Sequence, residues 1–154
     1  MTLSNSKIGF TLIELLIVIG ITVIVVAAGA SIYSHVLVST ELDETTAQLV
    51  QNLRLARQQS QTGLNNAPHG VQFQAHQYII YQGASYVMRD MSYDRTIGVG
   101  SAITLSATMT GGDVHFSTGL GVPNNPDSVG TITVTHAVSG SRTVNVNSLG
   151  VVTE

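Results

Sequence analysis

The sequence predicts an α+β protein in which a long N-terminal helix packs on an antiparallel β-sheet domain. Three observations predict this fold class: an apolar run from Phe10 to Tyr33, an amphipathic helical pattern from Ser34 to about Gln61, and strand-like segments after Pro68. The chain has 154 residues. About 120 of them remain to fold in water when the first part of the helix is set aside, which is enough for one domain.

The first element is an apolar helix with one charged side chain, Glu14. The run from Phe10 to Tyr33 is 24 residues long, and a helix of this length spans ~36 Å, enough to cross a hydrocarbon core of ~30 Å. An ionisable group inside lipid costs at least ~2.5 kcal/mol, so Glu14 needs a compensating partner or a function. The nearest cation is Lys7, on the other side of Gly9.

The second part of the helix, from Ser34 to about Gln61, contains neither proline nor glycine. Six side chains recur there at alternating spacings of 4 and 3, which places them on one helical face: Leu42, Thr46, Leu49, Leu53, Ala56 and Ser60. Val50 widens this stripe. The pattern predicts a helix that packs on a domain rather than a coiled coil, because a coiled coil needs about three or four sustained heptads. The helix should end near Gly63, since breakers follow at Asn65, Asn66 and Pro68.

After Pro68 the apolar residues follow a period of two, which indicates strands. Val71–Gln74 and Gln77–Tyr81 predict a hairpin that turns at Ala75 and His76. Further strand candidates, separated by Gly-rich or polar segments, are Tyr86–Arg89, Ala102–Ala107, Asp113–Ser117, Thr131–His136 and Arg142–Asn147. The last two predict a closing hairpin that is apolar on one face and carries Thr and Asn on the other.

The segment Gly9-Phe10-Thr11-Leu12-Ile13-Glu14 resembles the class III signal and N-terminal helix of type IV pilins and of the pseudopilins of type II secretion. In that family a prepilin peptidase cuts after the glycine and N-methylates the new first residue, and the glutamate five residues into the mature chain guides subunit docking. The resemblance implies cleavage between Gly9 and Phe10, N-methylation of Phe10 and a filament-assembly role for Glu14. The Phe10 amine of one subunit would neutralise Glu14 of its neighbour and form a buried pair.

The rest of the chain is most similar to the GspH/FimT group of minor pseudopilins and minor pilins. This similarity rests on Leu53–Arg57 in the helix, Val71–Phe73 in the first strand, Phe116–Gly119 with Gly121, and the closing hairpin Gly130–Gly150 with Leu149–Val152. Some FimT-like members carry basic residues just after the final glycine, associated with DNA uptake. Here that glycine is followed by Val151, Val152, Thr153 and Glu154.

The resemblance implies four segments: a prepilin leader (1–9), a transmembrane and filament-core helix (10–33), an amphipathic helix (34–62) and a β-rich globular pilin-like domain (63–154). It also implies a single-pass protein of the bacterial inner membrane, with its soluble domain in the periplasm or in an extracellular filament. The expected partners are other pilin or pseudopilin subunits, the prepilin peptidase, the inner-membrane assembly platform and the membrane itself.

Two other interpretations of the N-terminus stay open. In an ordinary secretory signal, Lys7 would be the basic region and Ala28-Gly29-Ala30 would precede cleavage at Ser31, but the apolar run exceeds the usual 7 to 15 residues or so. A plain membrane anchor would tolerate Glu14 without using it, although intramembrane carboxylates are functional by default.

Catalytic and metal-binding patterns are weak, so we expect no enzyme activity, no cofactor and no metal. Cysteine is absent, which excludes thiol catalysis and Cys-based zinc sites. The histidines form no H-x-H or helical i, i+4 pair, and no serine lies in a G-x-S-x-G setting; the histidines are His35, His69, His76, His115 and His136. Five residues could offer oxygen ligands to calcium, but they do not have the spacing of a calcium-binding loop: Asp90, Asp94, Asn124, Asn125 and Asp127. Polar turns explain their presence better than a calcium site does.

The charge distribution argues against DNA as a partner. The formal net charge is -3, and from Gly63 onward there is no lysine and there are only three arginines, Arg89, Arg95 and Arg142. Phosphate-driven affinity needs clustered Lys and Arg. The sequence therefore favours a structural subunit of a type II secretion pseudopilus or type IV pilus. The alternative is a pilus-tip binding module, a FimT-like subunit that captures DNA or another extracellular ligand.

The expected processing can be tested directly. The membrane peptidase needs a small residue whose backbone it can approach closely, so Gly9→Val should leave the leader attached. Intact-mass analysis of the membrane-extracted wild type should show loss of residues 1–9 and a gain of one methyl group on Phe10. A mature chain that begins at Ser31 would instead identify a secretory signal.

Overall fold

The computed structural model describes residues 9–124 and 128–154, except for the side chains of residues 29–35. It contains two compact units, Met1–Leu37 and Val38–Glu154, and helix α1 (Leu12–Gln61) contributes to both. Positions 1–8 of the expected leader lie outside the described residues, as do the side chain of His35 and the loop residues Asn125 and Asp127.

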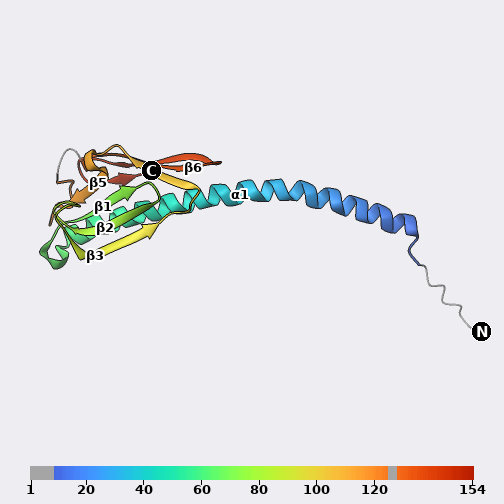
Figure 1. The fold of residues 1–154 in the computed structure, drawn as a ribbon, viewed down its shortest axis with the longest axis horizontal. Coiled ribbons are helices and arrows are strands. Elements are labelled where there is room, and N and C mark those ends of the chain that lie inside the picture. Colours follow the sequence, from blue (N-terminus) through green and yellow to red (C-terminus); the bar gives the residue numbers. More distant parts are fainter. Residues whose placement is uncertain (1–8, 125–127) are drawn as a thin grey trace, which may run out of the picture. The chain divides into compact units, whose positions relative to one another are not determined.

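The Val38–Glu154 unit combines the second part of α1 with two four-stranded antiparallel sheets (Figure 1). The first sheet has the order β3-β2-β1-β5, formed by Arg89–Gly98, Gln77–Gly83, His69–Gln74 and Asp113–Phe116. The second has the order β4-β6-β7-β8, formed by Ile103–Ala107, Gly130–His136, Gly140–Val146 and Val152–Thr153. Two 3-10 turns, η1 (Leu64–Asn66) and η2 (Thr110–Gly112), connect these elements. The α+β fold class is confirmed.

The helical face predicted from the sequence is the face that packs on the sheets. All six residues of the predicted stripe, from Leu42 to Ser60, are at most 1% exposed. The two hydroxyls in the stripe are satisfied: Thr46 donates to the Leu42 carbonyl (2.8 Å), and Ser60 accepts the backbone N–H of His69 (2.8 Å). A buried polar group with such a partner avoids most of its desolvation cost, so the stripe tolerates these residues.

Both sheets contribute to one core with this helical face. The first sheet provides Val71 and Phe73 on β1 and Val114 and Phe116 on β5, and the second provides alternate residues of its central strands, Ile132, Val134, Val144 and Val146. The predicted hairpins are confirmed. β1 and β2 pair through Gln74 and Gln77, and β6 and β7 pair with their valines and isoleucine inward and their Thr and Asn side chains outward.

One strand prediction is wrong, and two strands, β3 and β8, have no sequence signal. The expected strand Tyr86–Arg89 is a turn, in which the Met88 N–H donates to the Ser85 carbonyl (3.1 Å), and β3 begins only at Arg89. β3 is an edge strand whose side chains are mostly exposed, so it lacks the period-two apolar pattern that reveals half-buried strands. β8 has only two residues and is too short to show a period.

The outer face of the first sheet is organised around Tyr81. This side chain is 1% exposed and reaches from β2 across β1 to donate to Oδ2 of Asp113 on β5 (2.6 Å). Burial raises the pKa of Tyr81. Desolvation would also raise the pKa of Asp113, but hydrogen bonds from His115 and Tyr81 outweigh it and lower that pKa. Tyr81 can cross β1 only because Gly70 lies there, as a Cβ on Gly70 would be 2.6 Å from the Tyr81 ring.

This packing predicts that Gly70→Ala destabilises the domain. The added methyl group would also lie 2.7 Å from the Val114 carbonyl, so the strand or the ring must shift, at a cost of about 1–3 kcal/mol. Urea unfolding of the full chain in detergent micelles measures the change. The control is Gly98→Ala on β3, where an added Cβ meets nothing within 4 Å. Equal stabilities of the two variants would contradict this account of Tyr81.

Candidate functional site

The expected processing and assembly residues lie where helix α1 begins. Thr11 is its N-cap: its hydroxyl oxygen accepts the backbone N–H of Glu14 (3.3 Å), and its carbonyl accepts the N–H of Leu15 (3.2 Å). Thr11 and Glu14 have the spacing of a capping box, in which the acid at the third helical position supports the helix start. The Glu14 carboxylate also lies at the positive end of the helix dipole.

The structure shows the Thr11 half of this capping box, and the docking role that the resemblance implies for Glu14 is separate from it. The signal for the cap was the spacing Thr-x-x-Glu ahead of an apolar run, which predicts a capping box from sequence alone. A carboxylate offers about four acceptor sites, so a local N–H and a donor from another chain can be accepted together. The two roles are therefore compatible.

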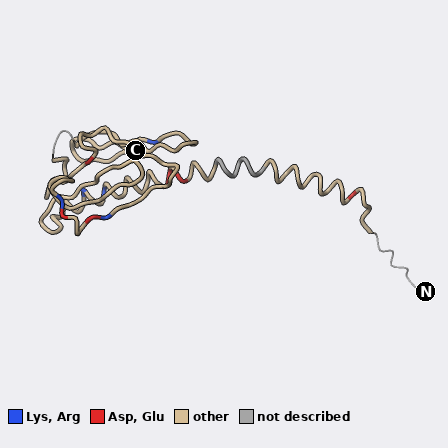
Figure 2. Tube along the Cα trace, in the orientation of Figure 1, with Lys and Arg blue, Asp and Glu red and all other residues tan. Residues whose placement is uncertain are grey.

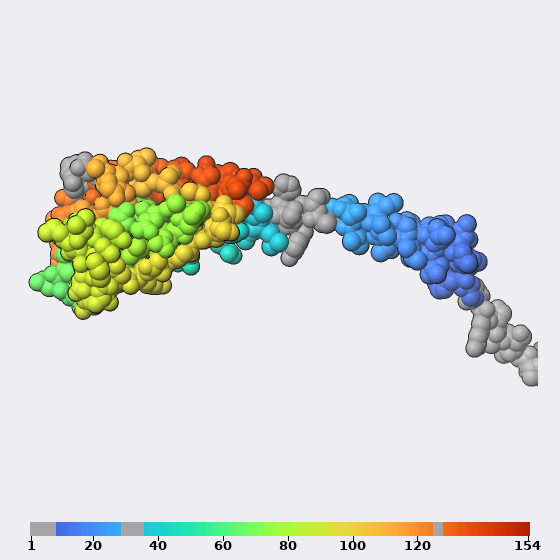
Figure 3. All heavy atoms as spheres, viewed as in Figure 1, coloured from blue at the N-terminus to red at the C-terminus, as the bar shows by residue number. Residues whose placement is uncertain are grey.

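The described part of the helix in the Met1–Leu37 unit exposes apolar side chains all round. Every large apolar residue from Phe10 to Val26 is more than half exposed, and Phe10 itself is 84% exposed. Figure 3 draws these side chains in blue, and Figure 2 shows the same stretch as uncharged apart from one acidic position. The hydroxyl of Thr22 donates to the Val18 carbonyl (2.7 Å) and so does not need water.

A helix that is apolar on all sides is normally covered by protein or by lipid. No helix among the described residues is both long enough and apolar enough to cross a membrane. The expected span 10–33 includes residues 29–33, whose side chains lie outside the described part of the chain. These residues include Ser31 and most of the alternative signal-cleavage motif Ala28-Gly29-Ala30.

In the Val38–Glu154 unit, the end of α1 holds two distant segments by hydrogen bonds to their carbonyl groups. Arg57 donates from Nε to Gly121 (3.0 Å) and from a terminal nitrogen to Leu149 (3.0 Å), and Arg54 donates to Val152 (3.2 Å). A Cβ on Gly150 would lie 2.4 Å from the Gly121 carbonyl oxygen and 3.1 Å from Arg57 Nε, so only glycine fits. Segments on which the expected GspH/FimT resemblance rests thus meet at one place, which we call the arginine clamp.

The three arginines considered for DNA binding are not brought together. Arg89 on β3 pairs with Asp94 (2.8 Å) and lies 3.8 Å above the Tyr86 ring. Arg142 lies on β7 of the other sheet and pairs with Asp43 of α1 (3.0 Å). Carboxylates therefore offset the charge of two of the three, and only Arg95 has neither an ion pair nor a hydrogen bond among the described residues.

The described histidines occupy separate structural positions. His76 Nδ1 contacts the Ile103 carbonyl (2.9 Å), and His136 Nδ1 accepts two backbone N–H groups of the following turn. His115 contacts both Asp113 and Ser128 through the same nitrogen, Nδ1, which is not the geometry of a catalytic triad, where the acid and the nucleophile use different nitrogens. No group of three or more potential metal ligands occurs among the residues that the structure describes.

Comparison with known proteins gives one match. Residues 4–30 match the family model of the prokaryotic N-terminal methylation motif, a range that contains Gly9, Phe10 and Glu14. This motif indicates a membrane-anchored, type IV pilin-like or pseudopilin protein, and it implies processing by a prepilin peptidase and assembly with other pilin-type subunits. Neither the curated proteins nor the solved structures gave a match to this chain.

The arrangement of the arginines predicts weak binding to DNA. The full chain in neutral detergent should bind duplex DNA only at low salt, and binding should disappear near ~0.15 M salt, because no cluster of cations releases counterions. Fluorescence anisotropy with a labelled duplex measures this. Submicromolar affinity at physiological salt, lost in Arg95→Ala, would support the DNA-capturing alternative instead.

Proposed function

We propose that this chain is a minor pseudopilin or pilin subunit, which assembles through α1 into a type II secretion pseudopilus or a type IV pilus. The observation that carries this proposal is the exposed apolar helix from Phe10 to Val26, with one carboxylate in its first turn and within the methylation motif. Such a surface needs a cover, and the interior of a helical filament provides one.

Before assembly, residues 10–33 would lie across the inner membrane as a single pass, and the domain after them would lie in the periplasm. The prepilin peptidase would remove residues 1–9 and methylate Phe10, and the inner-membrane assembly platform would then move the subunit into the filament. The sequence length supports this proposal, because 24 residues with one charge are enough for a membrane span with some tilt.

The carboxylate of Glu14 would then set the stagger between neighbouring subunits. In an apolar filament interior, an unpaired carboxylate is costly, whereas a carboxylate next to the amine of a neighbouring Phe10 is neutralised. The pair forms only when the two helices have the correct offset. Docking thus exploits the cost of burying a charge to select one register.

The arginine clamp supports the finer assignment to a GspH/FimT-type subunit. It gives a physical reason for the residues on which that similarity rests: Arg57 holds the Gly121 and Leu149 carbonyl groups, and Gly150 leaves room for this contact. It does not depend on catalysis or on a bound cofactor, which agrees with a structural role.

Substitutions at Glu14 can separate docking from helix capping. Glu14→Gln keeps a side chain that completes a capping box but removes the charge, whereas Glu14→Leu removes both. If the charge sets the register, both variants should enter sheared filaments much less than the wild type, and Glu14→Leu should be more stable in the bilayer. Quantitative immunoblots of sheared filaments, at equal membrane levels, measure the incorporation.

Thr11→Ala is the matched control, because it removes the cap and keeps the charge. It should cost the helix about 0.5–2 kcal/mol and leave incorporation close to the wild-type level. Wild-type incorporation of Glu14→Gln, combined with a loss in Thr11→Ala, would show that Glu14 acts in this subunit as a capping residue and not as the docking group.

A further inference from the structure

The Val38–Glu154 unit contains a cavity of about 140 Å³ between the end of α1 and the first sheet. Its apolar lining comes from Leu55 on α1, Leu64 on η1 and Ile80 on β2. Its polar lining includes His69, Gln82 and Arg95, from β1, β2 and β3. Because three strands and two helical segments contribute to it, the fold itself fixes the positions of these side chains.

The polar groups of the cavity are amides, hydroxyls, the His69 imidazole and the Arg95 guanidinium, and neither Asp nor Glu is among the described residues that line it. At the rim, Asn65 donates to the side-chain oxygen of Gln82 (2.7 Å), which leaves the Gln82 amide N–H groups available. Arg95 contributes five more N–H donors and a full charge. The other arginines are engaged, Arg54 and Arg57 with carbonyl groups and the remaining two with carboxylates.

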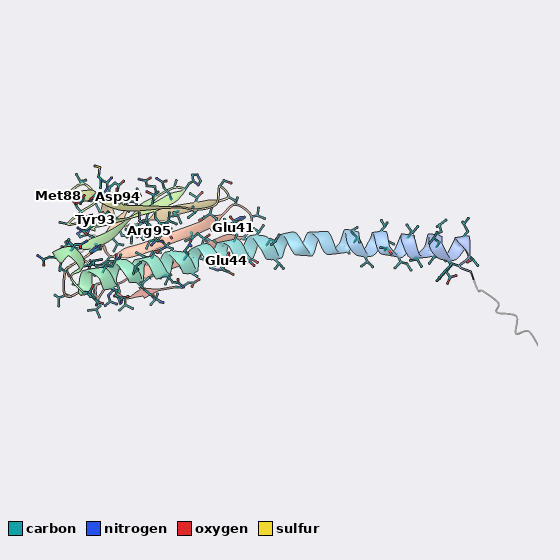
Figure 4. All side chains as sticks on the ribbon, turned by 90° about the horizontal axis from the view of Figure 1, so that it is seen from below. Glu41, Glu44, Met88, Tyr93, Asp94 and Arg95 are labelled. Atoms are coloured by element: carbon teal, nitrogen blue, oxygen red, sulfur yellow. The ribbon has the colours of Figure 1, made fainter. Side chains whose placement is uncertain are left out.

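The register of β3 with β2 places Arg95 opposite Ile80, which also lines the cavity. Tyr93 and Arg95, both labelled in Figure 4, line the cavity, and Asp94 between them pairs with Arg89. The charge of Arg95 also acts on the hydroxyl of Tyr78: burial raises the pKa of Tyr78, and Arg95 partly offsets this. Arg95 is exposed and makes no ion pair or hydrogen bond with the described residues, so its guanidinium is available.

His69 provides an independent indication that a ligand belongs here. The residue is 5% exposed, and its Nδ1 is buried without a hydrogen-bond partner, which is rare in folded proteins and requires an explanation. Its backbone is fixed by the hydrogen bond from its N–H to Ser60. Desolvation lowers the pKa of His69, partly opposed by a hydrogen bond of the ring with the Ala67 backbone, so burial favours the neutral ring, which carries a single N–H.

We propose that this cavity binds a carboxylate monoanion carried by a short aliphatic chain. The planar fork of an arginine matches a carboxylate, and one unpaired cation balances one negative charge. A phosphate would bring more charge than Arg95 alone can balance, in a domain with more acids than bases. The Leu55, Leu64 and Ile80 side chains suit the aliphatic part, and the volume, far below the 300–1,000 Å³ or so of drug-sized sites, limits the ligand to a few heavy atoms.

Such a carboxylate can belong to a free small acid or to an acidic side chain of another protein. Neither source requires the filament function proposed above, so failure of one proposal leaves the other intact. Butyrate represents the free acid, and the blocked peptide acetyl-Ala-Glu-Ala-amide represents the side chain. Butyramide, which has a similar shape and no charge, is the control ligand for both.

The test follows the His69 ring and the Arg95 side chain by NMR in the full chain in detergent micelles. Butyrate or the peptide should cause saturable shifts, with a dissociation constant on the order of 1 mM, and should raise the pKa of His69, because a nearby carboxylate favours its charged form. Butyramide should cause no saturable shift. The probe that binds more tightly identifies the source of the carboxylate.

Variants show whether the site is the one described. Arg95→Gln should weaken binding by about tenfold or more, because it removes a charged hydrogen-bond donor, and Arg142→Gln, on the other sheet, should leave binding unchanged. Shifts of equal size with butyramide, an unaffected affinity in Arg95→Gln, or no saturable shift with either carboxylate up to about 100 mM would overturn the proposal. The comparison of butyrate with butyramide in the wild type is decisive even if a variant fails to fold.

Discussion

The domain depends on one constraint, the burial of a single face of α1 against two sheets. Each large apolar side chain on that face, such as Leu49 or Leu53, contributes about 1.5–3 kcal/mol when fully buried. An exposed ion pair such as Arg142 with Asp43 contributes at most about 1 kcal/mol. Apolar burial therefore decides where the helix lies, and the polar contacts act only after the helix is in place.

The polar contacts connect this helix to segments that the sheets do not hold firmly. β8 has two residues, and its pairing alone cannot anchor the end of the chain. Arg54 and Arg57 provide the additional attachment, because they reach from the last turns of α1 to carbonyl groups of the C-terminal segment and of the loop at Gly121. Two guanidinium groups thus replace the strand pairing that a longer β8 would provide.

The beginning of the same helix presents the opposite physical situation. Its described apolar side chains are exposed all round, and its one carboxylate lies in the first turn, next to the Thr11 cap. The second part of α1 therefore buries its apolar face within the chain, whereas the first part requires a surface from elsewhere to cover its apolar side chains. This division suits the filament subunit proposed above, because the part that folds does not compete with the part that would assemble.

The sequence by itself determined the elements whose signal is local. The 4-3 spacing from Leu42 to Ser60, the period of two in β1, β2, β6 and β7, and the N-terminal motif each reflect a repeat within a few neighbouring residues. The processing and docking roles of Gly9, Phe10 and Glu14 come from the resemblance and are still predictions. The Thr11 cap was also available in the spacing Thr-x-x-Glu.

Only the tertiary structure decided which side chains meet across the sheets. The edge strand β3 has no apolar period, because most of its side chains are exposed to water. Its extent and the directions of Asp94 and Arg95 therefore depend on its pairing with β2. The partners of Arg57 and the cavity around His69 join residues that are far apart in the sequence. Such contacts carry no local repeat, because they result from how the helix and the sheets pack and not from the conformation of any one segment.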